Sequence, residues 1–382
     1  MRYRERILAA LNHHEPDHVP LDIGGTDVTG INILAYRRLL SYLGIQENEP
    51  IPNLDTVQQL AEISETMLIR LCAHCRGVFP HPPSKWKFEL KESPDDEWFI
   101  DEWGICWRKP KASGYYFDLA SHPLVDKSKE EIDTYEWPDP LDPARFDGLI
   151  ETTKRIHDGG EYAVILSGIT GGGPMEVASW LAGFENFFVA LITDPKWADT
   201  LLDHVLDIKL KFWQAALSKV GEYVDIISES EDLGIQDRLM ISPNAFRQHI
   251  KPRLRQLIAG IKTHAPQVKI LLHSDGAILP ILPDLIEIGV DIINPVQVSA
   301  KGMDDTAFLK KEFGSSLVFW GGIDTQHILP FGNPADVEDE VHRRIDDLAP
   351  GGGYVVASVH NIQGDVPPEN IMAMVEAWKR FG

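Results

Sequence analysis

Cysteine is scarce in this chain, with three among 382 residues. That number cannot form the disulfide framework on which small secreted proteins depend, and it is typical of a reducing compartment. A long apolar run is also missing, since no stretch approaches the roughly 20 apolar residues of a membrane-spanning helix. The segment that follows Arg2, Arg4 and Arg6 is too short and polar for a secretory signal. We therefore expect a soluble, cytoplasmic protein without membrane contact.

Positive charge is in deficit as well. The chain has 36 lysines and arginines against 58 acidic residues, a formal net charge of -22. Such a chain repels a phosphate backbone, so we expect no nucleic-acid partner. The acidic residues are scattered as on a solvated surface, and 43% hydrophobic residues are ample for a large core.

The second half of the chain repeats one unit: a short apolar run, a turn and an amphipathic helix. The runs are nearly uninterrupted and rich in β-branched residues, as is typical of parallel strands buried on both faces. Asp225 and Asp291 occupy matching positions, where we predict strand entrances. The six runs are residues 163–166, 224–227, 268–272, 290–293, 317–320 and 354–357.

Helices are predicted between these runs. One begins at Ser242 and Pro243 and continues to residue 261, with a kink expected at Pro252. A second covers residues 278–286 and stops at Gly289. Strands and helices that alternate this often indicate βαβ units in a parallel sheet.

The predicted fold is an α/β (β/α)8 TIM barrel with an N-terminal helical extension. The six runs and residues 19–23 approach the eight strands of a closed barrel, and an open doubly wound sheet is the competing fold. Residues from about 80 to 139 are rich in proline, tryptophan and charge. Strand-like pieces at 98–100 and 115–117 predict an antiparallel insertion there, over the barrel mouth. We expect one domain over residues 1–382.

Polar residues follow the predicted strands at their ends, where barrel enzymes place catalytic groups. His273 and Asp275 follow one strand, Glu231 another and His360 the last; Asp22 lies in the first. These residues would meet at one rim, where histidines and carboxylates can hold a divalent metal such as zinc with one position open. The His-x-Asp spacing places both side chains on one face of an extended segment.

Spacing alone leaves other roles open for these residues. His273 and His360 also fit buried, hydrogen-bonded histidines, and Asp275 also fits the cap of the following helix. Glu229 and Glu231 also fit solvated loop residues, although carboxylates directly after a core strand are better candidates than those on a helix.

Three further features carry weaker signals. Residues 171–174, Gly-Gly-Gly-Pro, precede a helix whose N–H groups could hold an anion, but no phosphate-binding lysine follows, which favours a tight turn. Cys72 and Cys75 have a metal or redox spacing beside a helix-like stretch, with no second pair nearby. Aromatic residues of the insertion either line a pocket for a flat ligand or pack the insertion itself. They are Trp98, Trp103, Trp107, Tyr115 and Tyr116.

Motifs along essentially the whole chain resemble the uroporphyrinogen decarboxylase superfamily, which implies its barrel. Arg4-Glu5-Arg6 and NHHEPDHVP at 12–20 are similar to the start of decarboxylase-like proteins. Other motifs resemble the methyltransferase-like branch, the corrinoid-linked methyltransferases. They are DEWGI at 101–105, SHPL at 121–124, EDLGIQ at 231–236, HSDG at 273–276, WGGID at 320–324 and HNI at 360–362.

The chain departs from true decarboxylases at one motif. Those enzymes are expected to bind the acetate groups of their substrate with an arginine-rich N-terminal segment. Here the corresponding residues 21–27, LDIGGTD, contain no arginine, so such carboxylates would be poorly paired. His360 still matches the decarboxylase histidine before the closing Pro-Glu-Asn segment. A carboxy-lyase of porphyrin metabolism therefore stays the alternative.

The chain also departs from the methyltransferases, which typically hold zinc with His-x-Cys and a distant cysteine. His273 matches the histidine, while Asp275 and His360 stand at the two cysteine positions, and Glu231 is the natural further ligand. With a neutral histidine in place of a thiolate, we expect a more electrophilic ion.

The resemblance implies an enzyme with His273, His360 and Glu231 as catalytic residues. Its reaction moves a methyl group between a small methylated donor, such as an aryl methyl ether, and a corrinoid on a partner protein. Two alternatives are a protein that binds a tetrapyrrole or corrinoid domain without chemistry, and a hydrolase with a zinc-bound water. The sequence identifies neither donor nor partner, and it is compatible with a homodimer.

Overall fold

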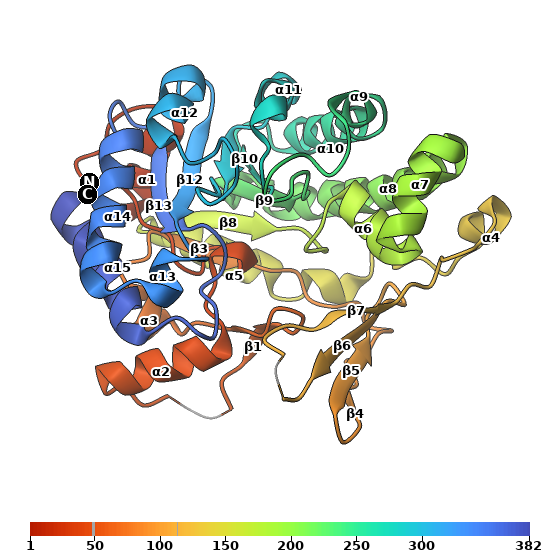
Figure 1. Cartoon of the computed structure of the whole chain (residues 1–382), viewed down its shortest axis with the longest axis horizontal. Helices are drawn as coiled ribbons and strands as arrows, with labels where there is room; N and C mark the ends of the chain where they lie inside the picture. The colour runs from red at the N-terminus through yellow and green to blue at the C-terminus, as the bar shows by residue number, and fades with distance from the viewer. Residues whose placement is uncertain (48–49, 113) are drawn as a thin grey trace.

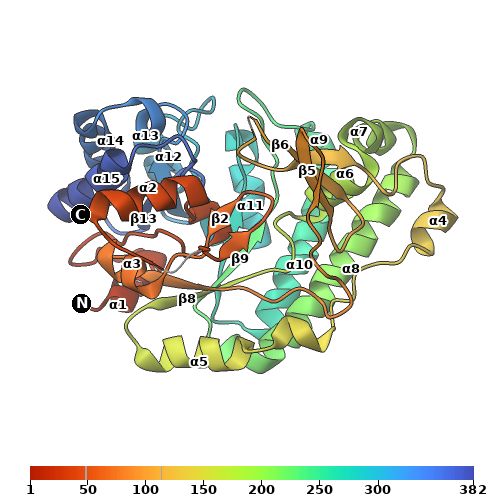
Figure 2. The same cartoon turned by 90° about the horizontal axis from the view of Figure 1, so that it is seen from below.

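The computed structural model of the chain describes residues 1–47, 50–112 and 114–382. Parallel strands surrounded by helices form its body, and a small antiparallel sheet stands at one end (Figure 1). Both termini lie on the same side of the molecule (Figure 2).

The parallel strands follow one another around a barrel in the order β13-β12-β11-β10-β9-β8-β3. Residues 20–22 connect the two end strands. Leu21 pairs in parallel with Val356, and its carbonyl accepts the N–H of His74 at the entrance to β3. The predicted barrel is thus confirmed, and the open sheet is excluded. The strands are β3 (Cys75–Val78), β8 (Ala163–Ser167), β9 (Ile226–Ser230), β10 (Lys269–His273), β11 (Ile292–Asn294), β12 (Val318–Ile323) and β13 (Tyr354–Ser358).

The aspartates predicted at strand entrances lie there and bond to neighbouring strands. Asp225 directly precedes β9 and accepts the N–H of Val164, while Asp291 directly precedes β11 and accepts the N–H of Ile270. Each carboxylate satisfies a backbone donor at the start of the adjacent strand.

The barrel interior is an apolar core separate from the core under the outer helices. Alternate strand residues point inward, for example Ala163 and Ile165 in β8. Helix α1 (Tyr3–Leu11) adds Ile7 and Leu11 to this interior core and contacts β8 and β13. The N-terminal helical extension therefore closes the end of the barrel at which the strands begin.

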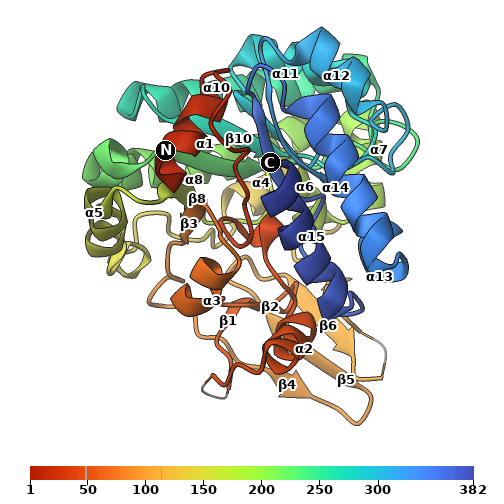
Figure 3. The ribbon, with the colours of Figure 1, turned by 90° about the vertical axis from the view of Figure 1, so that its left-hand side faces the viewer.

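Helices cover the outside of the barrel, and α14 packs along α15 (Figure 3). The kink predicted at Pro252 takes the form of a π-helical turn, Phe246–Ile250, that joins α9 to α10. The remaining helices are α2 (Ile33–Leu43), α3 (Glu65–Arg70), α4 (Lys129–Asp133), α5 (Leu149–Gly159), α6 (Pro174–Ala182), α7 (Phe184–Thr193), α8 (Pro195–Val220), α9 (Pro243–Ala245), α10 (Lys251–His264), α11 (Leu282–Ile288), α12 (Thr306–Phe313), α13 (Ile328–Phe331), α14 (Pro334–Leu348) and α15 (Pro368–Phe381).

The predicted antiparallel insertion is present as the sheet β4-β5-β6-β7. Its strands are β4 (Lys91–Glu92), β5 (Asp96–Ile100), β6 (Cys106–Pro110) and β7 (Asp118–Ser121), and a hairpin of β1 (Asn53–Asp55) and β2 (Leu60–Ala61) precedes it. The strand predicted around residues 115–117 lies directly after them, as β7. Those residues form a bend, because the N–H of Phe117 bonds to Val57 and the hydroxyl of Tyr116 bonds to Asn361.

Among the described helices, none alone has the length and apolar composition to cross a membrane. Helices α6 and α7 have that length and composition only when they are taken together, and the chain bends by 109° between them.

Candidate metal and substrate site

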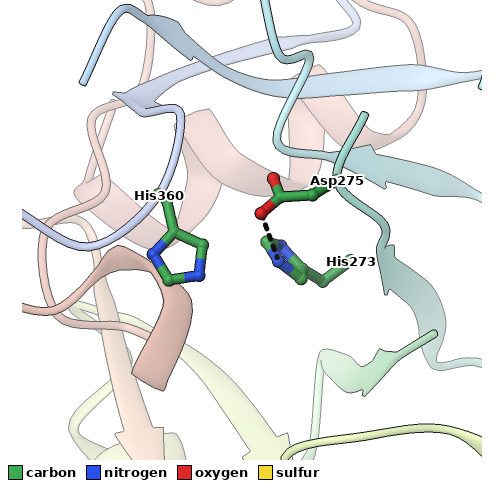
Figure 4. A group of neighbouring side chains, drawn as sticks. All are labelled: His273, Asp275 and His360. Carbon is green, nitrogen blue, oxygen red and sulfur yellow. Dashed lines mark ion pairs between the residues drawn. The ribbon is translucent and has the colours of Figure 1, made fainter. Parts of the chain in front are cut away.

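Two histidines and a carboxylate converge at the carboxyl ends of the barrel strands (Figure 4). His273 is the last residue of β10, and Asp275 follows two residues later. His360 lies two residues beyond β13. One ligand atom from each residue lies within 4.8 Å of the others, which is close enough for all three to reach one ion. We name these three residues the His-Asp-His group.

The two histidine rings lie nearly edge to face. Their centroids are 5.4 Å apart, and Nε2 of His273 is 4.0 Å from Oδ2 of Asp275. Oδ1 of Asp275 is buried and has no hydrogen-bond partner among the described residues. The alternative role of Asp275 as a helix cap is not seen, since the following 3-10 turn has Ile278 as its N-cap. A carboxylate that has one oxygen near His273 and the other buried without a partner fits a cation site.

Asn294 determines which nitrogen of His273 is free. Its amide nitrogen donates to the carbonyl of Trp320 at 3.0 Å, which directs Oδ1 toward His273. Nδ1 of His273 donates to that oxygen at 2.5 Å, so the lone pair is left on Nε2. A ligating histidine is commonly oriented in this way through its second nitrogen. His273 is thus buried and hydrogen-bonded, and it still offers a ligand atom to the group.

Asp232 supports the group from the end of β9. Its Oδ1 accepts the N–H of Asp275 at 2.8 Å. Burial opposes charge on His273, but Asp275 and Asp232 outweigh it and raise the pKa of that histidine. Burial lowers the pKa of His360. The pKa values of the two histidines of this group are therefore shifted in opposite directions.

Glu231, predicted as the further metal ligand, is not brought into the group. Both of its oxygens accept backbone N–H groups at the start of α6, from Met175 at 3.0 Å and Glu176 at 2.9 Å. Unpaired N–H groups at a helix N-terminus attract a carboxyl group, and these two bonds hold Glu231 at the start of α6. Burial raises its pKa to about 8 against these two hydrogen bonds.

The Gly-Gly-Gly-Pro segment is therefore a tight turn built around Glu231. A Cβ atom on Gly173 would lie 2.5 Å from the carbonyl of Ser230 and 2.6 Å from Cδ of Glu231. The free N–H groups at this helix N-terminus bind the side-chain oxygens of the chain's own Glu231.

Two other acidic candidates are buried and have partners. Glu229 pairs with Lys209 at 2.8 Å and also accepts the indole N–H of Trp213. It is therefore no solvated loop residue. Asp22 accepts hydrogen bonds from Thr29 and Trp320 and joins the first barrel segment to its neighbours. Both carboxylates belong to the frame around the site.

The Cys-x-x-Cys pair is divided between two environments. Cys72 lies in the turn after α3 with a φ of 59°, while Cys75 begins β3 and points into the interior core. Both thiols are free. The helix-like interpretation of this region missed β3, because Arg76 and Gly77 interrupt its apolar pattern.

A cavity of about 380 Å³ opens beside the His-Asp-His group. His273 and His360 line it from the barrel, and Trp86, Trp103 and Trp107 line it from the insertion. Of the five aromatic residues considered from the sequence, Trp103 and Trp107 line this cavity, as the pocket interpretation predicted. Trp98, Tyr115 and Tyr116 do not line it.

Sequence reasoning missed Asn294, and it placed Asp232 among the residues after its strand without giving it a role. Asn294 ends β11 and Asp232 follows β9, so both satisfy the strand-end criterion that found His273. Asparagine is not a usual zinc ligand, and Asp232 stands next to Glu231, which the motif favoured. Their role lies in hydrogen bonds to ligand residues, which only the folded chain displays.

Comparisons with known proteins identify the family of this chain and agree with its fold. Residues 110–381 match the uroporphyrinogen decarboxylase (URO-D) family. The uroporphyrinogen decarboxylase of Psychromonas ingrahamii is 23% identical over 279 residues, covering 69% of this chain and 73% of that protein. The Neisseria meningitidis enzyme is 23% identical over 270 residues, covering 69% and 72%. The structure of a methyltransferase from Methanosarcina mazei has a TM-score of 0.65 and 19% identity, covering 100% of this chain and 99% of that chain.

Proposed function

The chain belongs to the uroporphyrinogen decarboxylase family, as its motifs predicted, and on that premise we propose that it is a metal-assisted methyltransferase. It moves a methyl group from a small methylated molecule, such as an aryl methyl ether, to a corrinoid carried by a partner protein. The fold shared with a methyltransferase over the whole chain supports this proposal.

The convergence of His273, Asp275 and His360 is the observation that carries the proposal. These residues offer two imidazole nitrogens and one carboxylate oxygen, a donor set that zinc accepts with a position left for substrate. When bound there, zinc supplies Lewis acidity to the heteroatom that carries the methyl group. The set contains no thiolate, so it suits the donor side of methyl transfer better than activation of a thiol acceptor.

The surrounding residues act by positioning. Asn294 keeps Nε2 of His273 free for a ligand, and Asp232 holds the backbone of Asp275. Glu231 anchors the start of α6, which forms one side of the cavity through Glu176 and Trp180. We therefore assign Glu231 a positioning role in place of the ligand role expected from its motif.

Metal analysis of the purified protein tests the proposal. We expect about one zinc per chain, lost in His273→Ala and in His360→Ala and retained in His342→Ala, a control on the exposed face of α14. The zinc-loaded protein should then methylate a reduced corrinoid protein from a panel of methyl ethers, followed by the absorbance change of the corrinoid. A wild-type protein that binds no metal would contradict the metal-assisted mechanism.

Decarboxylation of uroporphyrinogen is the second candidate, since the curated relatives named above are uroporphyrinogen decarboxylases. The cavity opposes it, because its charged lining apart from the histidines is carboxylate, which repels the acid groups of that substrate. Incubation with uroporphyrinogen should give no carbon dioxide. Release of carbon dioxide that depends on His360 would favour the carboxy-lyase.

A further inference from the structure

The cavity beside the His-Asp-His group has a largely acidic lining. Its described lining includes five carboxylates and two histidines but neither lysine nor arginine. The carboxylates come from the β1 hairpin, the insertion, α6 and the β9 loop. They are Asp55, Asp101, Glu102, Glu176 and Asp232.

Most of these carboxylates are held without a cationic partner. Asp55 accepts the N–H of Gln58, Glu176 accepts the hydroxyl of Ser230, and Asp101 accepts the indole N–H of Trp107. Glu102 differs, since it pairs with the buried Arg145. Burial raises the pKa of Asp55 and of Asp101 to about 6, so both are largely ionised at neutral pH. Burial also raises the pKa of Asp232, and it raises that of Glu176 well above its usual value, so the negative charge comes mainly from the first two. A cation entering the cavity would meet uncompensated negative charge.

The lining of the cavity is also rich in tryptophan. Trp86, Trp103, Trp107 and Trp180 all border the cavity. The ring centroids of Trp107 and Trp180 lie 5.7 Å apart, and the ring planes are nearly perpendicular at 78°. Gly172 permits this arrangement, since a Cβ atom there would lie 2.7 Å from the Trp180 ring. Indole faces and carboxylates together are the recognition chemistry of ammonium groups.

A buried donor without a partner adjoins this cavity. Ser167 ends β8, is 7% exposed, and its Oγ has no hydrogen-bond partner among the described residues. It lines a chamber of about 300 Å³ that shares Asp55, Glu102 and His273 with the cavity. A buried hydroxyl without a partner costs free energy that a polar ligand can recover.

We propose that the substrate of this site carries a positive charge, as a protonated or methylated amine bound between the tryptophans and carboxylates of the cavity. The inference rests on the proposed function and narrows it. The methyl-bearing oxygen of such a substrate faces the His-Asp-His group, and its ammonium group contacts the wall formed by the insertion and α6. Neutral and anionic methyl ethers lack the attraction to that wall.

Three ligands of one size test the charge preference on the intact protein by calorimetry. They are 2-(4-methoxyphenyl)ethylamine, 2-(4-methoxyphenyl)ethanol and (4-methoxyphenyl)acetate, which are cationic, neutral and anionic at neutral pH. We expect the amine to bind about ten-fold more tightly than the alcohol, and the acetate more weakly still. Equal affinities, a preference for the acetate, or no binding of the amine would overturn the inference.

Two variants locate the binding wall. Trp180→Leu and Asp55→Asn should each reduce the ratio of amine to alcohol affinity by about three- to ten-fold. Phe184→Leu is the matched control, since Phe184 lies on the neighbouring helix, is 41% exposed and does not line the cavity. Thermal unfolding identifies any variant that fails to fold, and the comparison of ligands on the wild-type protein needs no variant. An unchanged ratio in both folded variants would place the cation elsewhere and refute the site.

Measurements of ligand affinity and of methyl transfer distinguish a failure of the charge preference from a failure of the proposed reaction. Methyl transfer from the alcohol and the amine with equal affinity for both would refute the charge preference alone. Preferential binding of the amine without methyl transfer from any ether would refute the proposed reaction and leave the cation site intact.

Discussion

Asn294 acts on the site through His273 without offering a metal ligand itself. Its amide is held by the carbonyl of Trp320, and its oxygen receives the Nδ1 proton of His273. Loss of such a partner frees the imidazole to rotate or change tautomer, and it commonly costs ten- to a hundred-fold in metal affinity.

Asn294→Ala should therefore weaken zinc binding by about ten- to a hundred-fold, measured by competition with a chromogenic chelator. Asn333→Ala, which removes the exposed N-cap of α14, provides the control and should leave zinc affinity unchanged. Wild-type affinity in Asn294→Ala would mean that the orientation of His273 does not depend on this amide.

His74 is a buried histidine at the opposite end of the barrel. It packs against Tyr3 and Trp378, and Nδ1 lies 2.9 Å from the carbonyl of Cys72. Burial lowers its pKa from 6.5 to about 3. The folded protein holds this ring neutral, whereas the unfolded chain takes up a proton below pH 6.5. The associated stability is complete above pH 6.5 and falls as the pH drops toward 3.

Because of His74, the free energy of unfolding should fall by about 1.4 kcal/mol for each pH unit of acidification below pH 6.5. His74→Gln keeps a donor for Cys72 and removes the titration. Urea unfolding at pH 7 and pH 5 should therefore show a smaller loss of stability in the variant, by about 2 kcal/mol. Equal losses in both proteins would mean that His74 is protonated in the folded state.

At the scale of elements, the start of α6 and the end of β9 form one unit. Glu231 bridges them, and Gly173 leaves the room that this bridge needs. The same two elements supply Glu176, Trp180 and Asp232 to the cavity. The packing of a turn thus decides the position of residues that line the cavity.

Gly173→Ala should destabilise the protein by about 1–3 kcal/mol, because its Cβ would overlap the carbonyl of Ser230 and the carboxyl of Glu231. Gly171→Ala in the same turn is the matched control, since its Cβ would meet nothing closer than 3.9 Å. Thermal or urea unfolding of the two variants measures the difference. Equal stability would show that α6 can shift without cost.

At the scale of the whole molecule, the site joins parts of the chain that are distant in sequence. His273 and His360 come from two barrel strands, and the tryptophan wall comes largely from the insertion. A ligand that bridges such parts binds the folded chain and not the unfolded one, so it stabilises the fold by mass action.

Zinc should therefore raise the thermal midpoint of the metal-depleted protein. Free zinc at a hundred times its Kd adds about 2.7 kcal/mol to the free energy of unfolding. The rise should be absent in His273→Ala and His360→Ala and preserved in His342→Ala. Equal rises in all four proteins would indicate binding outside the His-Asp-His group.

The sequence by itself determined the parallel α/β architecture and the rim at which the candidate residues meet, and its motifs predicted the barrel. Continuous apolar runs can only be buried between helices, and the carboxyl ends of parallel strands necessarily meet at one rim. His273, Asp275 and His360 were accordingly predicted together from their positions after strands, and the structure places them together. Strand β3 was not predicted, because two of its four residues are Arg76 and Gly77, which interrupt the apolar run that identifies a buried strand.

Only the tertiary structure decided what the polar residues near that rim contact. Glu231 and Asp232 are neighbours in sequence, yet one binds the N-terminus of α6 and the other the backbone of Asp275. The direction of each side chain depends on which unpaired backbone groups lie nearest, and distant segments supply those groups. The charge of the cavity also depends on the tertiary structure. Its carboxylates come from four separate parts of the chain, which line one cavity only after folding.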